Sequence, residues 1–325
     1  MSSAREYAAE LVDRFGRGWN RFFFIPVDPL PTAVLRIAVG AIALYWQVTY
    51  TADLDRFLGA DGLFPQALVE RLSGGGFSRW TLFALFPDAT GIWIAHGLAF
   101  VVLLAFLLGL KARVTAPLAL YVVLSYIHRA PMVTGLHEHL LTFLLAYLCI
   151  APCGAALSID AYLVRRRSAE TAGEQNGRSV AANIALRLIQ IHLVVVYGMM
   201  GLAKLGIGSE TWWLGEAVWW MAARPETRLV DLTPWLHAHT MLVNAWSHGI
   251  VLFELSFAIL IWNRMARPLL LALSVPMYFG LALISGQALF CLLLVTAGIA
   301  FLPAAKLRDW LKSIDGAPAN TQQPA

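Results

Sequence analysis

Long uncharged apolar stretches constrain this chain more than any other feature of its sequence. Segments 92–110 and 281–303, for example, contain no Asp, Glu, Lys or Arg. About 20 apolar residues in a helix cross the roughly 30 Å hydrocarbon core of a membrane, so runs of this length predict spanning helices. Charged residues make up only 14% of the chain, against roughly 25% in average soluble proteins. The sequence therefore predicts an all-α, polytopic integral membrane bundle and excludes a soluble protein.

Eight apolar segments predict about eight transmembrane helices. These segments are 30–49, 92–110, 114–128, 136–154, 183–205, 240–262, 267–285 and 287–303. With both termini in the cytoplasm, most of the 24 lysines and arginines fall in inside segments, as the positive-inside rule requires. The third and fourth segments are short, and the Trp-rich stretch 212–222 could re-enter the membrane, so the count lies between about seven and nine. We expect a multi-pass protein of the cell inner membrane.

Three regions follow from the same pattern. Residues 1–29 form a cytoplasmic N-terminal segment in which Leu11, Phe15 and Trp19 share one face, which predicts an amphipathic helix on the membrane surface. Residues 30–303 form the transmembrane domain, and residues 304–325 a cytoplasmic, partly disordered tail. The polar inside loop 168–178 is expected to be a flexible linker.

Lys204, at the end of the fifth apolar segment, is the strongest candidate for a functional group inside the membrane. Gln190, Tyr197 and Lys204 are seven residues apart and so share one helix face, and Gly201 leaves room beside the lysine. An ionisable residue in a span costs about 2.5–3.5 kcal/mol, so it persists where it is paired, functional or able to reach the headgroups. Lys204 is therefore either a lysine that extends to the outer headgroups or a buried, neutral amine that acts as a general base.

Other ionisable side chains leave similar alternatives. His137 opens the fourth segment at the same outer level as Lys204, where it is either bonded to loop backbone or part of a shared site. Glu254 lies in the middle of the sixth segment and Arg36 early in the first, so Glu254 could form a structural ion pair with Arg36 or with Lys204. The three cysteines fall in predicted spans and indicate no metal cluster, and the net charge of +4 is explained by topology, so no nucleic acid is expected.

The outside segment 206–239 is unusually rich in tryptophan. An aromatic belt at headgroup level does not require five in one loop, namely Trp212, Trp213, Trp219, Trp220 and Trp235. The loop 212–235 is therefore a candidate docking surface for a periplasmic protein.

Several short motifs follow one another in a recognisable order between about residues 28 and 303. They are Ile189-Gln190, Tyr197-Gly198-Met199-Met200-Gly201-Leu202-Ala203-Lys204-Leu205 and Trp212-Trp213-Leu214-Gly215-Glu216-Ala217, with Leu35-Arg36-Ile37-Ala38, Asp61-Gly62-Leu63-Phe64-Pro65, Gly109-Leu110-Lys111-Ala112-Arg113-Val114, Leu157-Ser158-Ile159-Asp160 and Phe253-Glu254-Leu255-Ser256-Phe257. Together they resemble the HTTM (horizontally transferred transmembrane) domain, which is the membrane domain of vitamin K-dependent γ-carboxylase and its bacterial relatives.

The resemblance implies an enzyme that oxygenates a quinol to an epoxide and uses the strong base so formed in carboxylation. In the γ-carboxylase the lysine of this motif is assigned as the base that deprotonates vitamin K hydroquinone, and Lys204 matches that position. A histidine upstream of the Ser-Val-Asp-like element is also implicated there, and His137 matches it. The helical bundle would keep water away from the base.

The resemblance also implies a site for a reduced quinone, either vitamin K hydroquinone or menaquinol, without a metal. Gln190, Tyr197 and Gly201 share the face of the lysine and would line that site. Many relatives have a histidine in the next-to-last helix, at about the position where this sequence has Tyr278.

Three functions remain open on the sequence. The first is a quinol- or lipid-phase oxidoreductase or carboxylase-like enzyme with Lys204 as base and His137 assisting. The second is a non-catalytic membrane anchor or assembly partner that docks a periplasmic protein on loop 212–235. The third is a small-solute transporter, for which flux would depend on Glu254.

Overall fold

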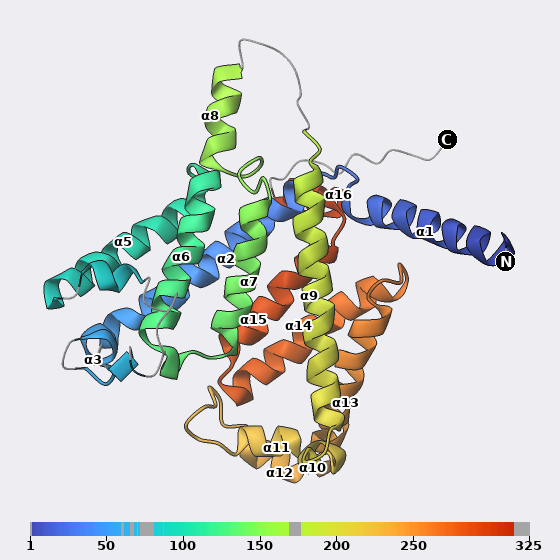
Figure 1. The fold of residues 1–325 in the computed structure, drawn as a ribbon. Coiled ribbons are helices and arrows are strands. Elements are labelled where there is room, and N and C mark those ends of the chain that lie inside the picture. Colours follow the sequence, from blue (N-terminus) through green and yellow to red (C-terminus); the bar gives the residue numbers. More distant parts are fainter. Residues whose placement is uncertain are drawn as a thin grey trace. The chain divides into compact units, whose positions relative to one another are not determined.

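The chain folds as a helical membrane bundle (Figure 1). A computed structural model describes residues 2–59, 62–65, 68, 69, 71, 81–86, 88–168 and 177–314. Within these ranges every regular element is a helix, and the one β feature is an isolated bridge between Val27 and Ser179. Asp61, most of the linker 168–178 and residues 315–325 of the tail lie outside the described residues.

A helix occupies each of the eight predicted apolar segments. These helices are α2 (Leu30–Thr49), α5 (Ala89–Leu108), α6 (Ala112–Arg129), α7 (Leu136–Ile150), α9 (Val180–Leu205), α13 (Thr240–Leu260), α14 (Ala266–Ser285) and α15 (Ala288–Ala297), the last continued by the 3₁₀ helix η5 (Gly298–Phe301).

Fewer helices than the predicted eight have the length and apolar composition that a membrane span needs. Among the described residues, five helices are long and apolar enough to cross a membrane, or six if a sharply bent pair counts as one span. The third and fourth apolar segments do not qualify. Helix α6 carries Arg113 and Arg129 near its ends, and α7 has only 15 residues, which is shorter than the roughly 20 that a span needs.

The chain divides into two compact units. The first unit contains residues 1–134, 142–188 and 302–325, and the second contains residues 135–141 and 189–301. Each is described by itself below.

In the first unit, α2 packs against α5, and α5 packs against α6. The N-terminal helix α1 (Ser2–Phe23) exposes the apolar side chains predicted to face the membrane, among them Leu11, Phe15 and Trp19. Its C-terminal end is held by α9, because the Asn183 amide donates to the carbonyl oxygens of Phe22 and Phe23 at 2.9 and 3.0 Å.

The beginning of the predicted tail is ordered as helix α16 (Ala304–Ile314), which packs against α2. Leu307 is buried, whereas Trp310, one turn further along this amphipathic helix, is exposed. Arg308 forms an ion pair with Asp28. The three-to-four-residue spacing of Leu307, Trp310 and Leu311 was the available signal for this helix.

Candidate functional site

The second unit brings together the C-terminal part of α9 with α13, and α14 with α15. Two glycines let α9 approach α13 closely. A methyl group at Gly198 would lie 3.5 Å from Ala258, and one at Gly201 would lie only 2.8 Å from the Leu255 side chain. Small residues allow such approach between membrane helices, and the result is that Lys204 and Glu254 meet.

Lys204 and Glu254 form a buried ion pair. The lysine Nζ lies 2.9 Å from Oε1 and 2.8 Å from Oε2 of the carboxylate, and it also donates to the Met200 carbonyl oxygen at 3.2 Å. The side chain of Glu254 is 1% exposed and that of Lys204 is 15% exposed. The lysine therefore turns inward to the acid, and does not extend to the surface as a headgroup-seeking lysine would.

Helices α10 (Glu210–Trp213), α11 (Ala217–Ala222) and α12 (Thr233–Ala238) form a cap, residues 210–238, that packs against α13 and α14. They lie beyond the ends of α9 and α13 (Figure 1). The ring of Trp212 lies 4.9 Å from Nζ of Lys204, within range of a cation–π interaction. The backbone N–H groups of Leu229 and Val230 donate to the Leu283 carbonyl oxygen at 2.9 and 3.1 Å and so fasten the cap to α14.

Two buried tyrosines lie beside the ion pair. The Tyr197 ring stacks on Phe257 with centroids 3.9 Å apart, and it meets Tyr278 edge-on at 5.8 Å. Both tyrosine hydroxyls lie near the Glu254 carboxylate and near each other. Within the described residues, however, the Tyr278 hydroxyl has no hydrogen bond of ordinary geometry.

An apolar groove of about 250 Å³ runs between α14 and α15 beside Tyr278. Phe279, Cys291 and Leu292 are among the other residues that line it. Apart from the tyrosine, the lining side chains carry no group that forms strong hydrogen bonds. The Tyr278 hydroxyl itself is buried behind its ring, so a ligand in this groove would meet hydrocarbon.

Gln190 takes no part in this group. Its amide Nε2 donates to the Ala300 carbonyl oxygen at 2.7 Å and ties α9 to η5. The seven-residue spacing thus distributes the side chains of Gln190, Tyr197 and Lys204 along the unit, and only the last two approach Glu254.

His137 contacts its neighbour Glu138, with Nε2 and Oε1 3.0 Å apart. The Glu138 side chain is 2% exposed and accepts a hydrogen bond of 2.8 Å from the Gly135 backbone N–H. The structure therefore places His137 beside a buried acid that the sequence analysis did not single out, and it shows no contact between His137 and Lys204. The assisting role of His137 stays a prediction.

Arg36 belongs to the first unit, whereas the ion-pair partner of Glu254 is Lys204. Its guanidinium is fully buried and donates to the carbonyl oxygens of Cys153, at 2.8 Å, and Leu157. A hypothetical side chain at Gly109 would collide with this guanidinium. Arg36 therefore holds the loop that follows α7 against α2.

Sequence reasoning missed a second buried polar group, which lies in the first unit. His96 Nδ1 is 2.7 Å from the Tyr126 hydroxyl, and the Gln47 amide donates to the His96 carbonyl oxygen at 3.1 Å. Thr51 lies 3.0 Å from the other ring nitrogen of His96. Gln47 and His96 lie inside two of the apolar segments, and polar residues in such positions were the sequence signal for this group.

Comparison with known protein families, with curated proteins and with solved structures finds no match to this chain. Within the described residues, no three His, Cys, Asp or Glu side chains gather in an arrangement that could hold a metal ion. The geometry around Lys204 and Glu254 therefore carries the functional argument.

Proposed function

We propose that this membrane protein is an enzyme that takes a proton from a lipid-soluble quinol, with Lys204 and Glu254 as the proton-transfer centre. The observation that carries the proposal is the buried pair itself, with Nζ within 2.9 Å of both carboxylate oxygens. Ionisable residues inside membranes are costly and mark functional pathways more often than they mark structure.

The chemistry of the pair supports proton transfer. A carboxylate can accept the ammonium proton over 2.8 Å, which turns two charges into a neutral hydrogen-bonded amine and acid. In a low-dielectric interior that exchange leaves no bare charge behind. A quinol hydroxyl that enters the site can then give its proton to the neutral Lys204 amine, and the ammonium so formed balances the charge of the quinolate while Glu254 stays protonated.

The surroundings of the pair fit a quinol in two respects. The groove between α14 and α15 is apolar, as a quinone ring with a prenyl chain requires. The buried Tyr278 hydroxyl lies beside this groove and lacks a well-formed hydrogen bond within the described residues, so it would bond one quinone oxygen if the ring of the quinol moved in past the groove wall. The resemblance to the HTTM domain of γ-carboxylase supports the same substrate class, with vitamin K hydroquinone or menaquinol as the quinol.

The test is quinol oxygenation by the purified protein in nanodiscs. Reduced menaquinone or phylloquinone is supplied with oxygen and bicarbonate, and epoxide is separated by chromatography. Epoxide is expected from the wild type and not from Lys204→Ala, whereas Lys306→Ala, an exposed lysine on α16, should retain full turnover. Equal epoxide from the wild type and Lys204→Ala would refute the assignment of the base.

His137→Ala tests the assisting role separately. A loss of turnover smaller than that of Lys204→Ala, with stability unchanged, would support assistance. Unchanged turnover would leave His137 as a partner of Glu138 only.

A second candidate function rests on the cap of the second unit. Trp213, Trp220 and Trp235 are each at least half exposed on it. Tryptophan is enriched at protein interfaces, so the cap would dock a periplasmic protein if the chain is a non-catalytic anchor. Co-purification of one partner that is lost when these three tryptophans are replaced by serine, together with absence of epoxide, would favour this function.

The orientation proposed for either function is inner membrane with both termini in the cytoplasm. It is supported by the excess of lysine and arginine in the segments assigned to that side. Accessibility of cysteines introduced at positions 10 and 210 to an impermeant thiol reagent would test it, because the two positions should differ.

A further inference from the structure

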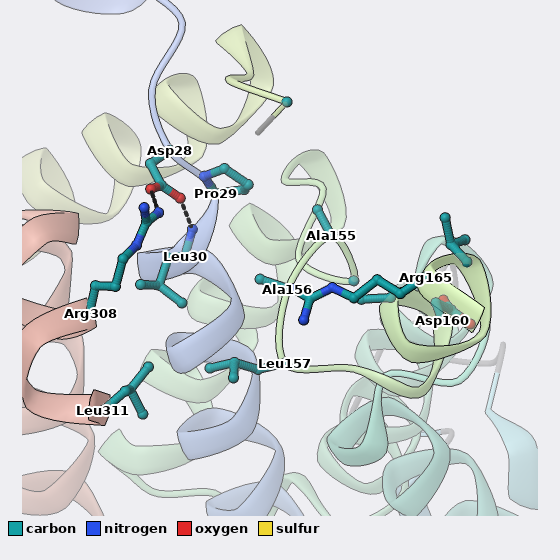
Figure 2. Close-up of a pocket in the computed structure, with 14 residues that line it drawn as sticks. Asp28, Pro29, Leu30, Ala155, Ala156, Leu157, Asp160, Arg165, Arg308 and Leu311 are labelled. Atoms are coloured by element: carbon teal, nitrogen blue, oxygen red, sulfur yellow. Dashed lines mark hydrogen bonds and ion pairs between the residues drawn. The ribbon is translucent and has the colours of Figure 1, made fainter. Parts of the chain in front are cut away.

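A cavity of about 460 Å³ lies in the first unit, and none of its lining residues belongs to the second unit, which holds Lys204. Its walls are the start of α2, the loop 154–157, α8 (Ile159–Ser168) and α16. Figure 2 shows Arg165 extending from α8 toward Ala156, while Arg308 reaches from the opposite wall to Asp28. Two guanidinium groups thus approach one cavity from opposite sides.

Both acids that line this cavity already have hydrogen-bond or ion-pair partners. Asp28 forms the ion pair with Arg308 and accepts a hydrogen bond of 2.9 Å from the Leu30 backbone N–H. Asp160 accepts bonds of 2.8 Å from the backbone N–H groups of Lys111 and Ala112. Dashed lines in Figure 2 join Asp28 to both its partners, and none reaches Arg165 among the residues drawn.

The wider surroundings are positively charged. Lys111 and Arg113 line an adjoining cavity that shares the wall at Asp160. The buried guanidinium of Arg36 holds the loop that forms one wall, through the carbonyl oxygens of Cys153 and Leu157. Arg165 and Arg308 line the cavity with Asp28 and Asp160, and Arg36, Lys111 and Arg113 add three positive charges nearby. An anion placed near Arg165 would therefore be attracted.

The same cavity has an apolar side and lies where a span begins. Leu30, Leu157 and Leu311 line it, and Leu30 is the first residue of α2, which opens a candidate span. Helix α16, on the opposite wall, is amphipathic and exposes Trp310. Residues at the start of a span lie at headgroup level, where phosphate and acyl chain meet.

We propose that this cavity binds an anionic phospholipid, with its phosphate between Arg165 and Arg308 and its acyl chains along the leucine wall. A planar guanidinium can donate two parallel hydrogen bonds to a phosphate. In a zwitterionic lipid the headgroup's own ammonium partly neutralises the phosphate, so an anionic lipid should bind more tightly. The site is independent of the proposed quinol chemistry, because none of its residues belongs to the second unit.

Native mass spectrometry of the delipidated, full-length protein tests the proposal with two lipids of equal acyl chains, phosphatidylglycerol and phosphatidylcholine. Phosphatidylglycerol is expected to bind more tightly to the wild type. Arg165→Gln should weaken it by about tenfold, which corresponds to about 1.4 kcal/mol. The matched control is Arg166→Gln, the adjacent exposed arginine of α8 that does not line the cavity, which should change affinity by less than about twofold.

Two further arms separate the lipid from a free anion. Millimolar inorganic phosphate should not displace phosphatidylglycerol, and Leu311→Gln should weaken lipid binding, because the acyl chains contribute. Displacement by inorganic phosphate would overturn the lipid assignment. Equal binding of both lipids, or equal effects of Arg165→Gln and Arg166→Gln, would overturn the site.

Discussion

Replacing Glu254 with glutamine is expected to destabilise the protein by about 3 kcal/mol. Removing one partner of a buried ion pair costs about 3–5 kcal/mol, because the other charge is left uncompensated. The lower end applies here, since Lys204 would keep its bond to the Met200 carbonyl oxygen at 3.2 Å and the Trp212 ring at 4.9 Å. Its side chain is also 15% exposed, so some water reaches it.

The gross attraction sets an upper bound on this effect. At the 2.8 Å separation of Nζ and Oε2, an effective dielectric constant of about 20 gives about 6 kcal/mol by Coulomb's law. Desolvation of both groups offsets part of this attraction. A coupling energy of about 2–3 kcal/mol between Lys204 and Glu254 is therefore expected.

A double-mutant cycle measures that coupling. Lys204→Met, Glu254→Gln and the double variant are unfolded by SDS in mixed micelles, with helix content as the signal. The double variant should lose less stability than the two single variants together, because neither charge is left alone. The exposed pair of Glu10 and Arg14 on α1 is the matched control, and Glu10→Gln should cost less than about 0.5 kcal/mol.

Additive effects in this cycle would refute the reasoning. If Glu254→Gln and Lys204→Met each cost less than about 1 kcal/mol and their effects sum, the two groups do not share a buried site. The proton-transfer proposal would then lose its structural basis, whatever the epoxide assay shows.

Three further predictions use the same unfolding measurement or hydrogen exchange. Gly201→Ala should destabilise the protein by about 1–2 kcal/mol, because its methyl group would lie only 2.8 Å from a leucine of α13. Gly198→Ala, whose methyl group would lie at an ordinary contact distance of 3.5 Å, should be neutral or stabilise the protein by up to about 1 kcal/mol. The reverse order would contradict the close helix contact. Tyr278→Phe should change stability by less than about 0.5 kcal/mol yet lower quinol turnover, and a larger loss of stability would mean that the hydroxyl is bonded in the resting protein. Asn183→Leu should speed amide exchange near the C-terminal end of α1, because two hydrogen bonds of about 1 kcal/mol each are lost; unchanged exchange would show that the anchoring lies elsewhere.

Hydrophobic runs predicted the positions of the long helices well, because a helix that crosses a membrane needs a long run of apolar residues whatever its neighbours are. The predicted segment 240–262 became α13 (Thr240–Leu260), and 267–285 became α14 (Ala266–Ser285). The short helices α10, α11 and α12 of the cap were not predicted, since helices of four to six residues carry too few turns for periodicity to show.

The partner of Glu254 illustrates what a single sequence leaves open. Arg36 and Lys204 were equal candidates, because the spacing along one helix does not say which other helix lies beside it. The answer depended on Gly198 and Gly201, which let α9 approach α13. The sequence indicates that Gly201 leaves space beside the lysine, but it does not show that the same glycine makes the contact with α13.

The cations of Arg36 and Lys204 are both placed inside helical units, but their partners give them different chemistry. Arginine keeps its proton under all ordinary conditions, and the carbonyl oxygens of Cys153 and Leu157 that bind Arg36 accept hydrogen bonds without taking a proton. Lys204 faces Glu254, whose carboxylate can take the proton and leave a neutral pair. Of the two sites, only that of Lys204 can change its protonation without stranding a charge in hydrocarbon. Arg36 therefore serves as a structural tie, and proton chemistry in this protein is expected at Lys204.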